Sequence, residues 1–169
     1  IVLKEYYPEN YLQYEDYIGT YTATVDDYDE GPTSQSVTIT PKVRGESYTL
    51  KSIGGFNFTL LYDKASGKLI LDSQSISPVS SSSYYFACAA GVEGYAHTEL
   101  SLPSRLRSGL VNVTVKINPF TFYFADKASQ ENTSLIIWAY SSDEYSTSGL
   151  MGYWSWYNSI LMEKENEGN

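Results

Sequence analysis

Hydrophobic and polar residues alternate along most of this chain from Ile18 onward. In residues 19–27, Tyr21, Ala23 and Val25 occupy one parity, and threonines occupy much of the other. A period of two is the pattern of a β-strand that buries one face. More or less regular forms of it predict further strands at residues 33–40, 46–53, 56–63, 68–74, 84–92, 110–117, 120–126, 133–140 and 149–164.

Polar turn sequences separate these stretches. Residues 26–32 (DDYDEGP) predict a hairpin, and Gly67 within DKASGK predicts a left-handed turn. The most regular alternation, at 110–117, places valines inward, and Pro119 ends that ladder. About 8–10 consecutive antiparallel strands hide their edges most simply by closing on themselves. We therefore predict an all-β fold, an antiparallel up-and-down β-barrel.

The first 17 residues lack this alternation. They are acidic and rich in tyrosine, and Pro8 prevents a helix from beginning before it. A short helix or an extended strap is expected there. The sequence thus predicts a lead-in segment at 1–17, a single barrel domain at 18–164 and a C-terminal tail at 165–169.

The last predicted strand carries a dense aromatic stretch, GYWSWYNSILMEK, at residues 152–164. Period-two geometry places Trp154 and Trp156 on the same face as the aliphatic residues. Burial of each tryptophan would stabilise the fold by about 2–3 kcal/mol, which favours a core role over an exposed binding platform. Tyr153 and Tyr157 fall on the other, mixed face, so they are candidate exposed contact residues.

Residues 135–140 (LIIWAY) are apolar on both faces of a predicted strand. Ile136, Trp138 and Tyr140 share one parity, and the residues between them share the other. One of these faces must be covered or must bind something, because a large exposed apolar patch marks an interaction site. The predicted ligand-binding residues are therefore Tyr153, Tyr157, Trp138 and Tyr140.

Composition and charge limit the classes of partner that this chain can bind. The chain is 42% hydrophobic and 18% charged, as expected of a globular protein. A net charge of −9, with only three arginines and eight scattered lysines, does not suit a nucleic acid or an anionic membrane surface. No run of about 18 apolar residues is present, so no transmembrane span is expected in these residues. Because the chain begins with Ile1 rather than Met, we expect a processed or trimmed form whose export signal or lipid anchor lay upstream.

The single cysteine and the single histidine offer little chemistry. Cys88 lies among small apolar residues, which predicts a buried and unreactive thiol. His97 and Cys88 together cannot supply the three or four ligands of a zinc site, and no Gly-x-Ser-x-Gly nucleophile elbow is present. His97 is expected to be a surface or loop residue.

Acidic residues raise two further hypotheses. Asp27, Asp29 and Gly31 cluster in DDYDEG, but Thr38 stands where a calcium-binding EF-hand loop requires a bidentate glutamate, so a solvated hairpin loop is favoured over a calcium site. A glycosidase requires two carboxylates about 5–10 Å apart across a cleft. The candidates Asp72, Glu93, Glu99 and Asp126 lie in no distinctive motif. We therefore expect no enzyme, no catalytic residues, no metal and no cofactor.

Two stretches carry a resemblance to a known class of domains. YIGTYTATVDDYDEGPTSQSVTIT near the start and GYWSWYNSILMEK near the end resemble the calycin-like (lipocalin-like) domains of Bacteroidetes cell-envelope lipoproteins. The matching positions are Gly19-Thr20-Tyr21 and Trp156-Tyr157-Asn158. The resemblance implies an exported β-barrel at the cell envelope, in the periplasm or at the outer-membrane surface, with a lipid anchor upstream of residue 1. It brings no established catalytic residues.

The functional expectation is a non-catalytic, exported barrel that binds a small ligand. An apolar molecule would enter the barrel, whereas a saccharide would stack on exposed aromatic rings. The alternative is a structural or protein-interaction module of a larger envelope lipoprotein, whose apolar outer faces would contact a protein partner.

Overall fold

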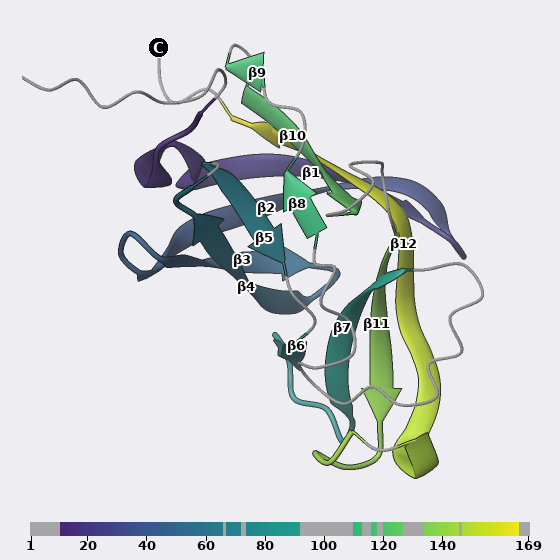
Figure 1. Cartoon of the computed structure of the whole chain (residues 1–169). Helices are drawn as coiled ribbons and strands as arrows, with labels where there is room; N and C mark the ends of the chain where they lie inside the picture. Colours follow the sequence, from purple (N-terminus) through teal and green to yellow (C-terminus); the bar gives the residue numbers. More distant parts are fainter. Residues whose placement is uncertain are drawn as a thin grey trace, which may run out of the picture.

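A computed structural model describes residues 11–65, 67–71, 74–91, 110–112, 116–117, 120–126, 134–145 and 147–165. Most of these residues lie in strands, and the strand pairings are antiparallel (Figure 1). Two short 3-10 turns, η1 (Tyr14–Tyr17) and η2 (Thr147–Gly149), accompany the strands. In the part of the chain so described, no helix has the length and apolarity needed to cross a membrane. The all-β fold predicted from the alternation is confirmed.

Eight strands close the barrel in the order β1-β2-β3-β4-β6-β7-β11-β12, and β12 pairs again with β1. Most neighbours in the ring are also neighbours along the chain, so the up-and-down topology agrees with the prediction. The strands are β1 (Gly19–Asp27), β2 (Gly31–Val43), β3 (Ser47–Ile53), β4 (Phe56–Asp63), β6 (Gln74–Pro78), β7 (Tyr85–Gly91), β11 (Ser134–Tyr140) and β12 (Leu150–Lys164).

Three further strands, β5 (Lys68–Leu71), β8 (Leu110–Asn112) and β10 (Phe120–Asp126), close the same barrel a second time at one end, and β9 (Lys116–Ile117) pairs with β10 beside them. The two groups of strands share β4 and β12. The start of β4 pairs with β6, and its last residues pair with β5. In the same way, the first half of β12 pairs with β11, and residues 161–163 pair with β10. Figure 1 shows β12 running along both groups of strands. We call the end near η1 the η1 end, and the end at the β1–β2 and β3–β4 hairpins the mouth.

Several predictions fall outside the described residues. The backbone of β8 and β9 covers part of the predicted strand 110–117, but the side chains of Val111, Val113, Val115 and Ile117 are among those not described. The same holds for His97, Asp72, Glu93, Glu99 and the side chain of Asp126. The domain boundaries at residues 17, 18 and 164 stay predictions.

Inward-facing side chains fill the barrel between its two ends. On β1 the buried residues are Tyr21, Ala23 and Val25, as the alternation predicts. Val37 and Ile39 on β2 are buried as predicted. These side chains belong to one cluster, which also contains Leu50, Phe58, Leu60, Phe86, Ile160 and Met162. Because a narrow barrel is commonly filled by its own side chains, a ligand has little room in this part of the interior.

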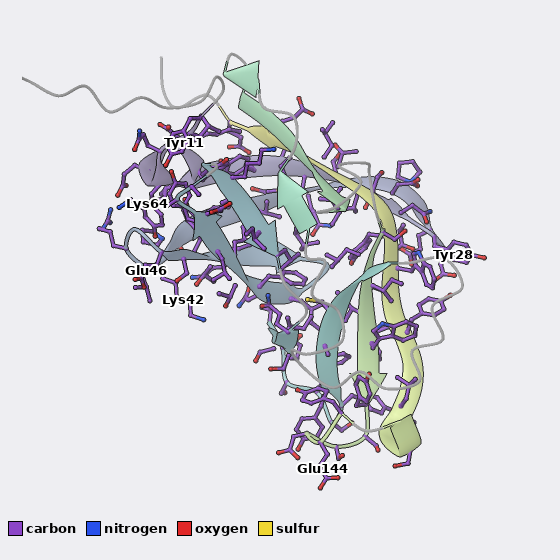
Figure 2. The ribbon with its side chains drawn as sticks, in the orientation of Figure 1. Tyr11, Tyr28, Lys42, Glu46, Lys64 and Glu144 are labelled. Carbon is purple, nitrogen blue, oxygen red and sulfur yellow. The ribbon has the colours of Figure 1, made fainter. Side chains whose placement is uncertain are left out.

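Tyrosines close the η1 end and tie the lead-in segment to the barrel. The ring of Tyr14 stacks on that of Tyr48, with centroids 4.4 Å apart. The tyrosine hydroxyls donate to backbone carbonyls: Tyr14 to Ser47 (2.6 Å), Tyr17 to Gly67 (2.7 Å), Tyr21 to Tyr17 (2.7 Å) and Tyr48 to Tyr14 (2.8 Å). At the edge of this group, Tyr11 donates to the carbonyl of Lys64, and Figure 2 shows the two residues together. Buried hydroxyls with partners add specific anchoring to the apolar burial of the rings.

Cys88 on β7 is buried in the main core, which confirms the sequence prediction for this residue. Burial raises the pKa of the thiol to about 12, so the reactive thiolate is scarce at neutral pH. We expect a disulfide reagent such as DTNB to leave the native protein unmodified and to label one thiol per chain after unfolding in guanidinium chloride. Stoichiometric labelling of the native protein within minutes would contradict the burial of Cys88.

Candidate functional site

The mouth of the barrel holds a cavity of 330 Å³. The β1–β2 hairpin, the β3–β4 turn and β12 supply its walls. The lining residues are Val25, Asp27, Asp29, Glu30, Thr33, Gln35, Gly54, Trp154, Ser155 and Tyr157. This lining combines two aromatic rings with three carboxylates and contains no lysine or arginine. Its volume is at the small end of the range for small-molecule sites, and we call it the mouth pocket.

The β1–β2 turn places the carboxylates at the rim of the mouth pocket. A side-chain oxygen of Asp27 accepts hydrogen bonds from the backbone N–H groups of Asp29 (2.8 Å) and Glu30 (3.1 Å). This Asx turn explains why the predicted hairpin loop DDYDEG folds sharply here. Within the described residues, no group of three or more His, Cys, Asp or Glu side chains is arranged to hold a metal ion.

Tyr157 and Gly54 meet in the lining of the mouth pocket. Gly54 has a φ of 62°, and a Cβ atom placed on it would lie 1.8 Å from the Tyr157 hydroxyl. The side-chain oxygen of Gln35 accepts the Gly54 N–H at 2.9 Å, which holds the turn in place. Burial raises the pKa of Tyr157, and the nearby Asp27 and Glu30 carboxylates raise it further. The phenol therefore stays protonated and can donate a hydrogen bond at neutral pH.

Two of the three bulges in β12 lie in the aromatic stretch and change which of its side chains face the interior; the third leaves Met151 as an extra residue against β11. Asp26 pairs with Ser159 and Asp27 with Tyr157, so Asn158 is an extra residue against β1. Ile137 pairs with Ser155 and Trp138 with Tyr153, so Trp154 is an extra residue against β11. Each bulge reverses the relation between residue number and sheet face.

The bulges overturn two expectations for the aromatic stretch. Trp154 and Trp156 were expected in the core with the aliphatic residues, but 53% of Trp154 is exposed and Trp156 lies half-buried against a cluster on the outer face of β11. Tyr157 was expected to be exposed, but only 4% of it is exposed: it belongs to the main core and lines the mouth pocket. A strict period of two fails because β12 contains extra residues.

Trp154 projects from its bulge toward the mouth. Its ring lies edge-on to the buried Phe86 ring, with centroids 5.3 Å apart, and Phe86 in turn packs on Phe56 at 4.9 Å. The other side of Trp154 approaches Tyr84, at 6.1 Å between centroids. The core thus fixes one edge of the indole and leaves much of the rest open.

Contacts on the outer face hold the hairpin against β12. The Tyr153 hydroxyl donates to both carboxylate oxygens of Asp29, at 3.1 and 3.2 Å. This hydrogen bond raises the pKa of Tyr153, because the neutral phenol is the donor. The Tyr28 N–H donates to the Trp156 carbonyl at 2.8 Å, and Figure 2 shows Tyr28 beside β12. These contacts set the position of one wall of the mouth pocket.

Comparison with known proteins gives a family. The sequence model of DUF4987, described as a domain of unknown function, matches residues 1–138. The chain belongs to the DUF4987 family. No curated protein and no solved structure matches it. The matched part of this DUF4987 domain includes both hairpins of the mouth pocket, whereas Trp154, Ser155 and Tyr157 follow it in the chain.

The four predicted ligand-binding residues of the DUF4987 domain lie in different environments. Tyr157 lines the mouth pocket, and Tyr153, which is 40% exposed, supports its rim through Asp29. Trp138 and Tyr140 are buried in the outer cluster with Ile136 and Ala87. Both faces of the LIIWAY strand are therefore covered, one by the main core and one by this cluster. A role of the four residues in ligand binding stays a prediction.

No local pattern in the sequence links the residues that form the mouth pocket. Gln35 and Gly54 were not singled out, and Trp154 was placed in the core. The Gly54-Gly55 pair is a turn signal that could have marked the β3–β4 hairpin. The contact between this turn and Tyr157, over 100 residues later, follows from closure of the barrel and has no local signal.

Proposed function

We propose that this domain is a non-catalytic binding domain that holds a saccharide in the mouth pocket. The observation that carries the proposal is the composition of the lining, which combines the rings of Trp154 and Tyr157 with the carboxylates of the β1–β2 turn. Aromatic rings offer apolar faces to the C–H groups of a sugar, and carboxylates and amides accept hydrogen bonds from its hydroxyls. The protonated Tyr157 hydroxyl and Gln35 add further polar groups.

The close packing of the described core residues favours a ligand at the mouth over an apolar molecule inside the barrel. Buried side chains such as Phe58 and Leu60 belong to this main core. A fatty acid or sterol would have to displace them, at the cost of the core packing that they provide. The three carboxylates also disfavour anionic ligands, so neutral or amino sugars suit the pocket better than uronates.

We propose that the barrel is exported and calycin-like, and the position of Lys164 supports the relationship. In lipocalins, a basic residue near the last strand packs over the first-strand tryptophan of a Gly-x-Trp motif; in this sequence Tyr21 stands in place of that tryptophan. Lys164 lies opposite Tyr21 in the β1–β12 register, its side chain lies against Gly19, and its Nζ donates to the Asp16 carbonyl at 2.8 Å. The arrangement is consistent with a calycin-like domain of a Bacteroidetes envelope lipoprotein, anchored upstream of residue 1.

Intrinsic tryptophan fluorescence tests the proposal. The purified domain is titrated with neutral oligosaccharides, amino-sugar oligosaccharides, uronates, and a panel of fatty acids and sterols. We expect a saturable shift with neutral or amino sugars, because Trp154 is exposed at the pocket, and no saturable shift with uronates. Saturation only by fatty acids or sterols would place the ligand in the interior, and no response to any panel would reject the saccharide proposal.

Two neighbouring glycines provide a matched test of the pocket. Gly54→Ala would place a methyl group 1.8 Å from the Tyr157 hydroxyl, whereas a methyl group on Gly55 meets nothing within 4 Å. Both residues have positive φ, so both variants lose about 1–2 kcal/mol of stability through the backbone, and overpacking against Tyr157 adds to this loss in Gly54→Ala. Only Gly54→Ala should move Tyr157, and we expect it to weaken saccharide binding by about tenfold or more. Equal affinity of the two variants would show that Tyr157 does not shape the site.

A second candidate function is that of a protein-interaction module. Exposed apolar side chains favour it, among them Met151, Val79 and Tyr85, which are 59%, 61% and 44% exposed. Such a module would bury these side chains in a protein contact. Concentration-dependent association in analytical ultracentrifugation, abolished by Met151→Lys, together with no sugar response, would favour this function.

A further inference from the structure

The mouth pocket continues into an exposed aromatic surface. Trp154 lines the pocket and also approaches Tyr84, which precedes β7, and 38% of Tyr84 is exposed. The planes of the two rings are tilted by 50° to each other, so the rings do not stack face to face. We call these two rings the Trp154–Tyr84 platform.

The core holds the platform in position. Phe86, of which only 1% is exposed, makes a T-shaped contact with Trp154 and is itself packed against Phe56. A ring fixed in this way loses little side-chain entropy when a ligand binds. Exposed serines 81–83 come directly before Tyr84, and the Ser82 hydroxyl accepts the Tyr84 N–H at 3.2 Å. Exposed hydroxyl groups, which can hydrogen-bond to a sugar, therefore precede the platform in the chain, and that of Ser82 lies at the Tyr84 backbone.

Resting on the proposed function, we propose that the ligand is a chain of at least three sugar units. One unit occupies the mouth pocket, and the following units lie across Trp154 and then Tyr84. The pocket alone is small, at 330 Å³, and Trp154, which belongs to its lining, is also half of the platform. A single sugar would leave the platform uncovered, whereas a chain covers both rings and gains their contact area.

The test is a length series. Cello-, malto- and chito-oligosaccharides of one to six units are titrated against the domain, with tryptophan fluorescence and isothermal calorimetry as readouts. We expect the affinity to rise at least tenfold between one and three units in the series that binds. We expect Tyr84→Ala to lower the affinity for three or more units by at least fivefold, with a loss that grows with chain length.

Tyr85→Ala is the matched control. Tyr85 is the next residue, is 44% exposed, and pairs with Tyr140 on the opposite face from Phe86. Its removal should leave the length dependence unchanged. An affinity that does not change from one to six units would overturn the chain proposal but keep the saccharide site. Equal effects of Tyr84→Ala and Tyr85→Ala would also overturn the chain proposal, and no binding by any series would reject both the chain and the saccharide site.

Discussion

Raising the pH from 9 to 11 should destabilise this domain by about 4 kcal/mol. Burial raises the pKa values of Tyr17, Tyr21 and Tyr48 far above the ordinary value of 10.0. Below pH 10 these phenols are protonated in both the folded and unfolded states. Above it, the unfolded tyrosines release protons while the folded ones keep them, so the unfolded state gains about 1.4 kcal/mol per pH unit for each residue.

Guanidinium unfolding between pH 8 and 11.5, followed by circular dichroism, measures this loss. Tyr48→Phe removes one ionisable group together with its hydrogen bond to the Tyr14 carbonyl. It should cost about 1 kcal/mol at pH 8 but reduce the alkaline loss by about a third. Tyr28→Phe, at a position where the ring is 65% exposed, should leave the slope unchanged. A free energy of unfolding that is constant to pH 11.5 would contradict the burial of the tyrosines at the η1 end.

Gly67→Ala should destabilise the barrel by about 2–5 kcal/mol, the sum of a left-handed backbone cost and an overpacking cost. Gly67 has a φ of 72°, which confirms the left-handed turn predicted for DKASGK. A Cβ atom here would lie 2.8 Å from both the N and O atoms of Leu12. Those are backbone atoms of the lead-in segment, so they cannot move aside without disturbing its contact with the barrel.

Gly45→Ala is the matched control for Gly67→Ala. Gly45 has a φ of 84°, and a Cβ atom there meets nothing within 4 Å, so only the backbone cost of about 1–2 kcal/mol applies. Chemical denaturation of both variants measures the difference, which reports the packing of the lead-in segment on the barrel. Equal destabilisation of the two variants would show that Leu12 does not lie against the β4–β5 turn.

Local alternation predicted the strands with regular pairing and failed where the pairing is irregular. β1 pairs with β2 without a register shift, and Tyr21, Ala23 and Val25 are buried as expected. β12 contains extra residues at Asn158 and Trp154, and these are defined by β1 and β11 rather than by β12 itself. A bulge of this kind depends on the partner strands, so the pattern within β12 could not place Trp154 or Tyr157 on the correct face.

The mouth pocket depends on contacts between distant segments in the same way. The Asp27 turn was visible as a polar hairpin, and Tyr157 was a candidate contact residue, but nothing local linked them. Ring closure through β12 brings Tyr157 to Gly54 and Trp154 to Phe86. The sequence therefore identified some of the residues and turns of the site. Which of them lie together depends on the strand register of the whole barrel, which no local pattern predicts.

The most direct test of saccharide binding at the mouth is the NMR response of the three indole N–H groups. Trp→Phe variants assign the resonances, and the oligosaccharide series is then added to the labelled domain. Binding at the mouth pocket predicts a saturable shift of the Trp154 resonance, whose ring is exposed there, with little change for Trp138, which is buried in the outer cluster. A saturable shift confined to Trp138 and Trp156, with Trp154 unmoved, would contradict a ligand site at the mouth of the barrel.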